Sequence, residues 1–304
     1  MTTLITAVPP GRLPGAVPTG PIGRRLAERL VAAGEPVRVL APGQEAWGWP
    51  EGADVIEGSV LDPAASPRAF AGLDRVFLAG ATPATRREKV TSVYEVVQRA
   101  VDGGAGQLTV LSSHGPVFEM SQPPERWFWL AVERAVEMSA PRWTHIRPSA
   151  VMASMLVGGY PPTGSSWAAM IRRGQVIREP SLDAAYPFVD EDDVAAVAAA
   201  ALLGTADGGR VIEADGPPIS ARARAALISD AIGTPVRLEE LSPDEARRRW
   251  LEEGWPAETI EVTLWAQTEF LAHPLPPNPT IDRVLGRPAR TFPQWLASHR
   301  DAFC

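Results

Sequence analysis

The chain has 304 residues and a net charge of −7 at neutral pH, with acidic and basic residues mixed along its length. This length is enough to bury a substantial core, and the lack of a basic stripe argues against nucleic acid as a partner. A single cysteine, Cys304, excludes an internal disulfide framework and a cysteine-based metal cluster, and no run approaches the roughly 20 apolar residues of a membrane span. We therefore expect a cytoplasmic protein without a metal site, a membrane anchor or a nucleic-acid partner.

Short β-rich runs alternate with helical patterns through the first half of the chain. This alternation predicts βαβ units and a parallel sheet. Strands are expected at residues 4–8, 37–41, 54–57, 75–79, 107–112 and 143–147, and helices between them at residues 21–33, 67–71, 85–102 and 125–139. Right-handed crossovers bring the carboxyl ends of such strands to one edge, where the ligands of open α/β sheets bind.

The connection between the first strand and the first helix differs from that of a standard nucleotide-binding unit. In such a unit a tight glycine turn lets backbone N–H groups and the helix N-terminus approach a pyrophosphate. Here ten residues, 9–18, lie between Val8 and Thr19, and four of them are prolines, which have no N–H to donate. The sequence leaves open whether this loop blocks or gates a nucleotide site.

Beyond Arg147 the pattern changes to helices with a few short strands and many prolines. Helices are expected at residues 150–156, 166–173 and 190–203, with a further helix that Ser242 opens as N-cap, and a strand at residues 211–214. The predicted fold class is therefore α/β, with a Rossmann-like doubly wound parallel sheet in residues 1–148 and a smaller, mostly helical lobe in residues 149–304. Some segments of the lobe should return to the sheet, and the cleft between the two parts is the expected site.

Several short motifs, in their order and spacing, resemble those of the NmrA-like branch of the atypical short-chain dehydrogenase/reductases. They are Thr19-Gly20-Pro21-Ile22-Gly23, Gly58-Ser59-Val60-Leu61-Asp62, Leu111-Ser112-Ser113, Glu133, and residues 143–148, 189–195 and 286–295. The resemblance covers nearly the whole chain and implies a Rossmann fold that binds NAD(P), with activities from reduction of quinones and related small molecules to redox sensing without catalysis. The coenzyme contacts that it implies are Gly20, Ile22, Gly23, Ala79, Thr82 and Ser112.

The chain departs from the family pattern where it would hold the coenzyme. The second strand ends in Leu40-Ala41-Pro42, with neither an acid for a ribose hydroxyl nor an arginine for a 2′-phosphate. No tyrosine has a lysine partner of the Tyr-x-x-x-Lys kind, and Trp129 stands where relatives commonly carry a histidine or lysine. These departures favour a scaffold that has lost its coenzyme, so no cofactor is expected, although NADP and NAD stay open as alternatives.

His114 is the first candidate for acid–base chemistry, because a histidine at the carboxyl end of a strand can act as a general acid or base at neutral pH. In this hypothesis Glu119 orients His114 or protonates a carbonyl, and Tyr160 adds a hydrogen bond to the substrate. The alternatives are a surface-loop histidine and a solvated loop carboxylate. His145 lies inside a strand and is expected to be a packed core residue.

An apolar wall for the substrate is expected from residues that flank the same edge, since tryptophan and methionine suit apolar or polycyclic ligands. The candidates are Ser113, Trp127, Trp129, Pro148, Met152, Met155 and Trp167. Ordinary core packing is the alternative for the methionines and for most of the ten tryptophans. Asp190, Asp192 and Asp193 are interpreted as a helix cap rather than a metal site.

The residues support three hypotheses from different functional classes. The preferred one is a cofactor-independent biosynthetic enzyme that cyclises or isomerises an apolar or polycyclic small molecule by holding a reactive conformer. The second is an NAD(P)H-dependent reductase of a quinone or enone, and the third is a non-catalytic protein that senses NAD(P) or binds a ligand. A monomer or homodimer is expected, and the sequence does not specify the substrate or the stereochemical outcome.

Overall fold

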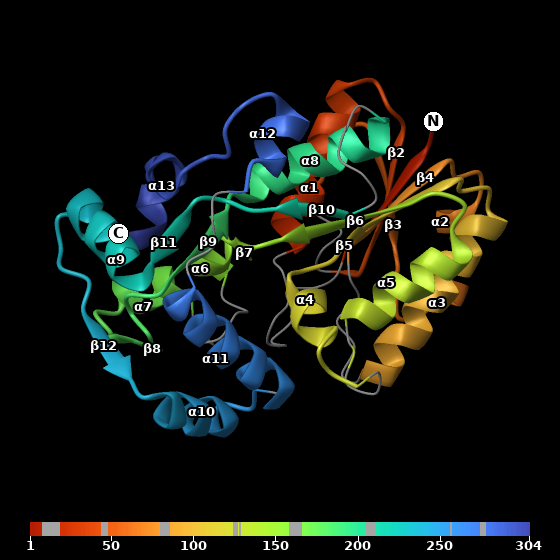
Figure 1. Ribbon diagram of the computed structural model, residues 1–304. Coiled ribbons are helices and arrows are strands. Elements are labelled where there is room, and N and C mark those ends of the chain that lie inside the picture. Colours follow the sequence, from red (N-terminus) through yellow and green to blue (C-terminus); the bar gives the residue numbers. More distant parts are fainter. Residues whose placement is uncertain are drawn as a thin grey trace.

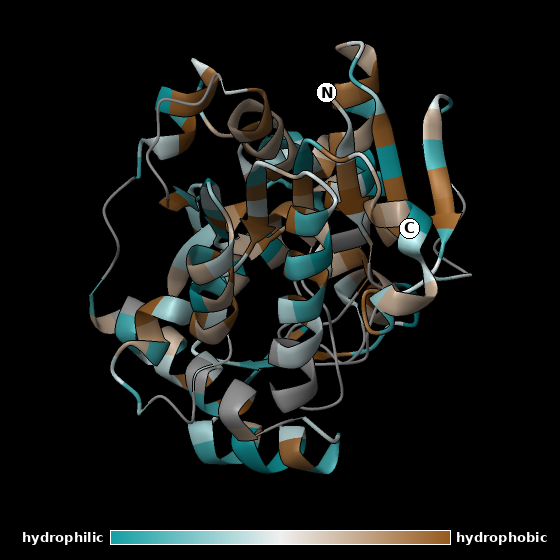
Figure 2. Ribbon diagram, turned by 90° about the vertical axis from the view of Figure 1, so that its right-hand side faces the viewer, coloured by the Kyte–Doolittle hydropathy of each residue, from teal (hydrophilic) through white to brown (hydrophobic). Residues whose placement is uncertain are grey.

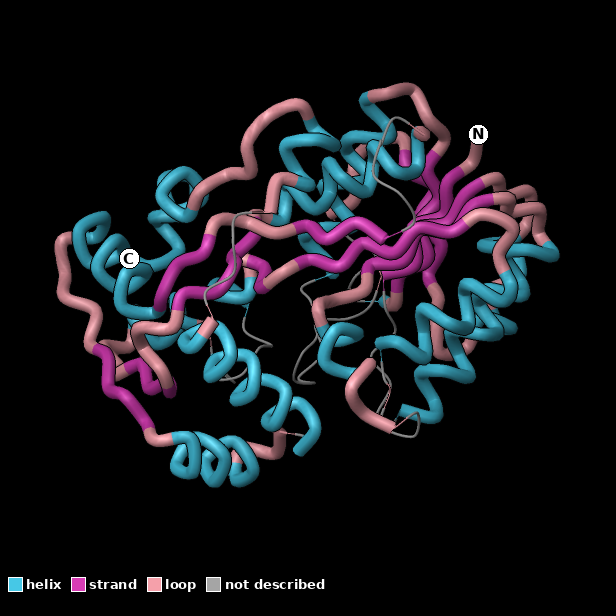
Figure 3. Tube along the Cα trace, in the orientation of Figure 1, coloured by secondary structure: helices cyan, strands magenta, loops and turns pink. Residues whose placement is uncertain are grey.

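A seven-stranded parallel sheet forms the centre of the chain in its computed structural model, which describes residues 1–7, 19–43, 48–79, 86–123, 127, 129–157, 166–204, 211–255, 257–273 and 278–304. The strand order is β10-β6-β5-β4-β1-β2-β3, and every neighbouring pair is parallel. The strands are β1 (Thr3–Thr6), β2 (Val37–Ala41), β3 (Ala53–Glu57), β4 (Arg75–Ala79), β5 (Gln107–Leu111), β6 (Trp143–Pro148) and β10 (Val211–Ala214). This is the doubly wound Rossmann order with one added edge strand, so the predicted fold class is confirmed; Figure 3 shows the twist of the sheet.

Helices cover both faces of the sheet, and strand side chains therefore alternate between two cores. Ile5 and Phe77 belong to the core shared with α1 (Thr19–Ala32) and α8 (Glu191–Leu203). Their chain neighbours Leu4 and Val76 belong to the core shared with α3 (Arg86–Asp102) and α5 (Trp129–Ser139). Figure 1 shows the two helical layers, and Figure 2 shows hydrophobic residues along the central strands. The helices of these layers are α1 (Thr19–Ala32), α8 (Glu191–Leu203) and α12 (Thr280–Leu285) on one face, and α2 (Pro67–Phe70), α3 (Arg86–Asp102) and α5 (Trp129–Ser139) on the other, with the short helix η2 (Pro63–Ala65) before α2.

The C-terminal lobe has small sheets and short helices around a separate core. Its sheets are β11 (Pro218–Ser220) with β9 (Ala185–Val189) and β7 (Ala150–Val151), and β12 (Leu238–Leu241) with β8 (Ile177–Pro180). Its helices are α6 (Ser154–Val157), α7 (Trp167–Arg172), α9 (Ala221–Ile232), α10 (Pro243–Glu252), α11 (Ala257–Ala272), α13 (Phe292–His299) and η4 (Arg300–Phe303). Because α8, β10 and α12 rejoin the sheet, the lobe is not a separate stretch of chain, and the predicted boundary at residues 148/149 stays a prediction.

One predicted element was wrong. A helix was expected at residues 150–156, but Ala150–Val151 is a strand that pairs in parallel with β9, and only Ser154–Val157 is helical. The Ser154 hydroxyl donates to the Val151 carbonyl at 2.7 Å and closes the turn between the two. Hydrogen bonding to a strand distant in sequence outweighed the local helical preference of this segment.

The acidic cluster before α8 is a cap, as predicted. The Asp190 side chain accepts a hydrogen bond from the Asp192 backbone N–H at 2.8 Å, in the N-cap position. The same acids join three segments of the chain, because Asp192 pairs with Arg29 of α1 and Asp193 pairs with Arg287 after α12. Among the helices of the described ranges, none is long and apolar enough to cross a membrane.

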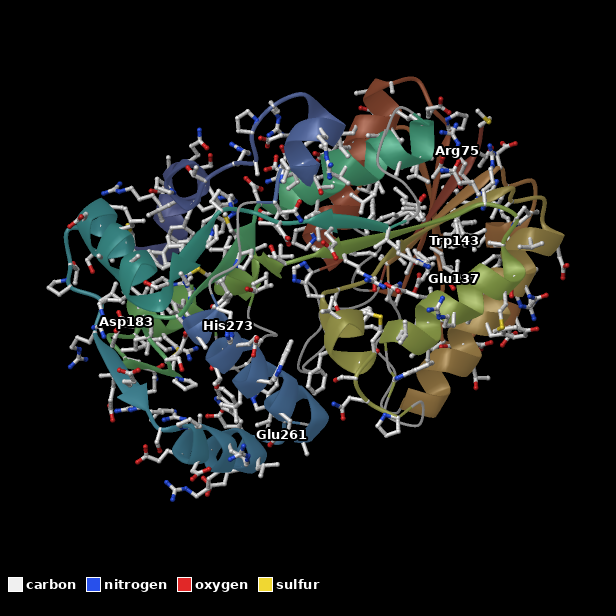
Figure 4. The ribbon with its side chains drawn as sticks, viewed as in Figure 1. Arg75, Glu137, Trp143, Asp183, Glu261 and His273 are labelled. Atoms are coloured by element: carbon white, nitrogen blue, oxygen red, sulfur yellow. The ribbon has the colours of Figure 1, made fainter. Side chains whose placement is uncertain are left out.

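His145 is a packed core residue, as predicted. It lies on β6 without solvent exposure, its ring stacks on Trp143 with centroids 4.6 Å apart, and its Nε2 atom lies 3.3 Å from a Glu137 oxygen. Figure 4 shows Trp143 and Glu137 close together at this end of the sheet. Burial lowers the pKa of His145 below 6.5, and the nearby Glu133 and Glu137 carboxylates offset only part of that effect.

We expect His145 to make folding sensitive to mild acid. Because its pKa is lower in the folded chain, the unfolded chain binds more protons below about pH 6.5, and the free energy of unfolding falls as pH drops through that range. The contribution of one proton is at most about 1.4 kcal/mol per pH unit. Denaturant unfolding of wild type and His145→Asn between pH 8 and pH 5 should show a shallower pH dependence in the variant; equal slopes would contradict the assignment.

Candidate functional site

The candidate site lies at the carboxyl ends of the central strands, on the side of the sheet that faces the C-terminal lobe (Figure 1). Two helices meet beside this edge: α4 (Gly115–Glu119), which follows β5, and α11 of the lobe. Phe118 of α4 and Trp265 of α11 have ring centroids 5.1 Å apart. The contact joins the two parts of the chain next to the strand ends, where ligands of this fold class bind.

The start of α1 fits the pyrophosphate of a dinucleotide. β1 lies between β2 and β4, which is the point where the strand order reverses, and α1 follows β1. The first turn of α1 carries no acidic side chain to compete with a phosphate for its N–H groups. A Cβ at Gly23 would lie 3.3 Å from Trp49 and 3.7 Å from Ile5, so glycine lets α1 pack closely on β1. The loop at residues 9–18 lies outside the described residues.

The predicted coenzyme contacts divide into backbone positions and buried side chains. Gly20 and Gly23 lie in the first turns of α1, where backbone N–H groups are available. Ile22 is fully buried in the sheet core, and both backbone groups of Ala79 bond to the Thr6 hydroxyl at 3.0 and 3.2 Å. The structure therefore gives Ile22 and Ala79 packing roles, and Thr82 lies outside the described residues.

A charged side chain lies near the end of β2, where sequence reasoning found neither an acid nor an arginine. Glu57 is the last residue of β3 and pairs in register with Ala41, and its Oε1 atom lies 3.2 Å from the position of a Cβ on Gly43. The Arg24 guanidinium of α1 lies 5.4 Å from the centroid of the Trp49 ring, in the segment between β2 and β3. Parallel register thus brings an acid to the end of β2 from the adjacent strand, and α1 brings an arginine to the segment that follows β2.

Ser112 is engaged in a buried network below the site. Its hydroxyl donates to Glu133 Oε1 at 2.6 Å, and Glu133 accepts two hydrogen bonds from Arg147 at 3.0 and 2.6 Å. Hydrogen bonding to Glu133 raises the pKa of Arg147. The Ser112 hydroxyl is therefore engaged with a buried carboxylate, and the coenzyme contact expected of Ser112 stays a prediction.

Glu119 holds the start of α5, and the orienting role expected of it toward His114 stays a prediction. Its two oxygens accept hydrogen bonds from the backbone N–H groups of Trp129 at 3.0 Å and Leu130 at 2.7 Å. A buried carboxylate at a helix N-terminus offsets the positive end of the helix. Glu119 thus supports the site by fixing the backbone of Trp129.

Trp129 packs on the loop that carries His114. A Cβ on Gly115 would lie 2.5 Å from the Trp129 Cδ1 atom and 2.9 Å from the Ser113 hydroxyl oxygen, so only glycine allows this contact. The Ser113 hydroxyl also accepts a hydrogen bond from the Gly115 N–H at 2.9 Å. The structure therefore brings Ser113, His114 and Trp129 together at the end of β5, as the sequence analysis expected.

The partner of His114 is Asp215, which sequence reasoning missed. The His114 Nε2 and Asp215 Oδ1 atoms lie 2.7 Å apart, and the other oxygen of Asp215 accepts a hydrogen bond from Asn278 at 2.8 Å. Asp215 directly follows β10. The backbone after Asp215 can follow its course only because residue 216 is glycine, since a Cβ there would lie 1.6 Å from the Phe188 carbonyl oxygen. The acid followed by a glycine at the end of a strand was the sequence signal that could have predicted Asp215 as a site residue.

The expected substrate wall is mostly packed within the protein. Met152, Met155 and Trp167 lie in the core of the C-terminal lobe, and the Trp167 indole donates to Glu179 at 2.7 Å. The Trp127 indole donates to the Gln122 carbonyl at 2.9 Å. Core packing therefore accounts for the methionines and Trp167, while Trp129 stays at the edge of the site. Pro148 is buried at the end of β6, and Tyr160 lies outside the described residues.

The chain is similar in sequence to an NAD(P)H-binding family and to two reductases. A family model described as NAD(P)H-binding matches residues 18–203. The chain is 36% identical over 292 residues to a (4-alkanoyl-5-oxo-2,5-dihydrofuran-3-yl)methyl phosphate reductase of Streptomyces griseus, covering 94% of this chain and 96% of that one. It is 26% identical to an NAD(P)H azoreductase of Xenophilus azovorans, again over 94% of this chain and 96% of that one.

Solved structures agree on the fold. A Citrobacter triphenylmethane reductase complexed with NADP(H) superposes with a TM-score of 0.72 at 17% identity, over 98% of this chain and 99% of that one. An NADPH-dependent quinone oxidoreductase of Escherichia coli complexed with NADPH gives a TM-score of 0.70 at 18% identity, with the same coverage.

These findings overturn the preferred hypothesis. The matching family is described as NAD(P)H-binding and the related sequences are reductases, so the expectation of no coenzyme was wrong, as was the preference for cyclisation or isomerisation. The prediction that the chain is an enzyme is supported, and so is the alternative that gave it oxidoreductase activity. The prediction was wrong because a pyrophosphate binds to backbone N–H groups at a helix N-terminus. Side-chain motifs do not show whether such backbone groups are available.

We expect Ser112→Ala to weaken folding without weakening coenzyme binding. Loss of the bond to Glu133 should lower the free energy of unfolding by about 1 kcal/mol, while the Kd for NADPH, measured by calorimetry, stays close to that of wild type. Ser229→Ala is the matched control, since that hydroxyl of α9 bonds only within the C-terminal lobe among its described contacts. A large rise in Kd in Ser112→Ala alone would return Ser112 to the coenzyme site.

Proposed function

The chain belongs to the NAD(P)H-binding family, and from this premise we propose that it is an NAD(P)H-dependent reductase of a small, largely apolar substrate with an electron-poor double bond. The observation that carries the proposal is the 36% identity to a reductase over nearly the full length of both chains. The name of that relative describes an unsaturated lactone that carries an alkanoyl group and a methyl phosphate, and its ring double bond, conjugated to carbonyls, is an activated alkene. A quinone or an enone belongs to the same chemical class of hydride acceptor.

The described residues fit a nicotinamide dinucleotide along the carboxyl edge of the sheet. The N–H groups in the first turn of α1 would hold the pyrophosphate, since no carboxylate of that turn competes for them. The nicotinamide half would lie toward β5, where Ser113, His114 and Trp129 meet. When bound, the reduced coenzyme supplies a hydride, that is, one hydrogen nucleus together with two electrons, to the substrate.

Trp129 supports an apolar acceptor in this arrangement. Its ring packs on Gly115 and is half-buried, so part of its apolar surface is available beside the loop. A rigid aromatic ring binds flat unsaturated molecules with little loss of side-chain entropy. Glu119 keeps the ring in place through the backbone of α5.

The purified protein should consume reduced coenzyme when an acceptor is present. We expect saturable loss of NADPH or NADH absorbance with a 3-alkanoyl-2(5H)-furanone or with menadione, and coenzyme binding that raises the thermal midpoint by mass action. Trp129→Ala should raise KM for the acceptor by roughly tenfold, equivalent to about 1.4 kcal/mol, and leave coenzyme Kd unchanged. Absence of coenzyme binding at millimolar concentration, together with absence of turnover, would overturn the proposal.

Glu57 and Arg24 should set the balance between NADH and NADPH. A carboxylate repels a 2′-phosphate and accepts a hydrogen bond from a 2′-hydroxyl, whereas a guanidinium attracts the phosphate. Glu57→Gln should therefore lower the Kd for NADPH relative to NADH, and Arg24→Gln should raise it. Calorimetric titration of both variants with both coenzymes measures the ratio, and an unchanged ratio in both would place the adenosine end away from these residues.

A further inference from the structure

We propose that His114 is the proton donor in the reduction and that Asp215 is its positioning residue. The inference rests on the reductase function proposed above and adds the residues that deliver the proton. Reduction of a double bond requires one proton in addition to the hydride. The geometry at the ends of β5 and β10 points to this pair as its source.

The two side chains reach each other across a neighbouring strand. His114 lies three residues beyond β5, Asp215 directly follows β10, and β6 runs between these strands in the sheet. The side chain of His114 is 29% exposed, whereas that of Asp215 is 9% exposed. One member of the pair is thus open to a ligand and to water, and the other is screened beneath it, which is the arrangement of an acid and its orienting carboxylate.

The carboxylate fixes which ring nitrogen can serve the substrate. An ionised carboxylate only accepts hydrogen bonds, so the proton between the two groups belongs to His114 Nε2, and Nδ1 is the atom left for chemistry. Within the described part of the chain, neither Nε2 nor Asp215 Oδ1 has a hydrogen-bond partner, and the 2.7 Å approach of the two atoms is an ion-pair contact.

Asp215 is itself held from two directions. Its Oδ2 atom accepts from the Asn278 amide at 2.8 Å, and Asn278 accepts in turn from the Thr280 N–H at 3.0 Å and the Thr280 hydroxyl at 2.6 Å. Behind it, Gly216 lies against the Phe188 carbonyl, where no side chain fits. These contacts restrict the carboxylate to one orientation, so Asp215 can fix the ring of His114.

The other polar side chains around the loop are committed elsewhere. Ser112 bonds to Glu133, and both oxygens of Glu119 bond to the N-terminus of α5. The Ser113 hydroxyl accepts from the Gly115 N–H. Of these described groups, His114 is the one whose side chain is an imidazole, the group that most often donates and accepts protons in catalysis.

The proton step balances with reduced nicotinamide as the reductant. A hydride adds to the β-carbon of an alkene conjugated to a carbonyl, and the alkene electron pair moves to form an enolate. The His114 Nδ1–H bond breaks, its proton goes to the enolate, and its electron pair stays on the imidazole. Water then returns a proton to Nδ1, so the alkene is reduced, the nicotinamide is oxidised and His114 is unchanged.

The test compares His114→Gln, Asp215→Asn and the double variant with wild type, using NADPH and a 3-alkanoyl-2(5H)-furanone. General acid catalysis contributes about 10²- to 10⁴-fold, so His114→Gln should lower kcat by about 100-fold or more while KM and the NADPH Kd change little. Asp215→Asn should lower kcat in the same way, and the double variant should be no slower than His114→Gln, because Asp215 acts through His114. Asp215→Glu should recover part of the lost rate.

A matched control is His273→Gln. His273 follows α11, is 76% exposed and pairs with Glu269 (Figure 4), so its loss should leave kcat and the thermal midpoint unchanged. If Asp215→Asn does not fold, the test is the solvent isotope effect on kcat, measured in H₂O and D₂O for wild type and His114→Gln. Wild type should turn over more slowly in D₂O. His114→Gln should have lost this isotope effect together with most of its rate.

The outcomes separate this inference from the proposed function. A wild type that binds no coenzyme and reduces no acceptor defeats the reductase assignment itself. An active wild type whose His114→Gln variant keeps its kcat defeats the proton-donor role. Independent, multiplicative losses in the double variant defeat the positioning role of Asp215.

Discussion

The arrangement of the candidate site depends on the parallel pairing of β10 with β6. The register sets Ala214 beside Pro148, so the residue after each strand reaches the same edge of the sheet. A slip of one residue would turn every side chain of β10 to the opposite face and move Asp215 away from His114. The close approach of Gly216 to the Phe188 carbonyl further restricts the chain at this point, because any side chain there would force the strands of the lobe apart.

Buried polar groups below the strand ends make the site rigid. Ser112, Glu133 and Arg147 satisfy one another, and Glu119 satisfies two backbone donors of α5. Burying such groups is costly unless they are hydrogen-bonded, so each network favours a single arrangement of the loop after β5. Most polar side chains around this loop therefore stabilise the structure, whereas the side chain of His114 is partly exposed and accessible to a ligand.

Membership of an NAD(P)H-binding family and the missing adenosine signatures are physically compatible. The pyrophosphate of a dinucleotide is recognised largely by backbone N–H groups, and α1 offers these whatever side chains follow β2. Glu57 lies beside Gly43, just after β2, and Arg24 of α1 lies over the Trp49 ring. A motif that lacks side-chain signatures after β2 is therefore not evidence of a lost coenzyme, because backbone N–H groups bind the pyrophosphate without them.

Local sequence determined the seven strands of the main sheet, the caps at Asp190 and Ser242, and the placement of His114 and Trp129 at one edge, because periodicity, capping chemistry and strand-end position are local properties. It did not determine the strand at Ala150–Val151, the core burial of Trp167, or the engagement of Ser112 and Glu119, since each depends on a partner from elsewhere in the chain. The contact between His114 and Asp215 joins residues about a hundred positions apart. Only the tertiary structure decides such a contact, because strand pairing and backbone packing, rather than spacing along the chain, bring the two side chains together.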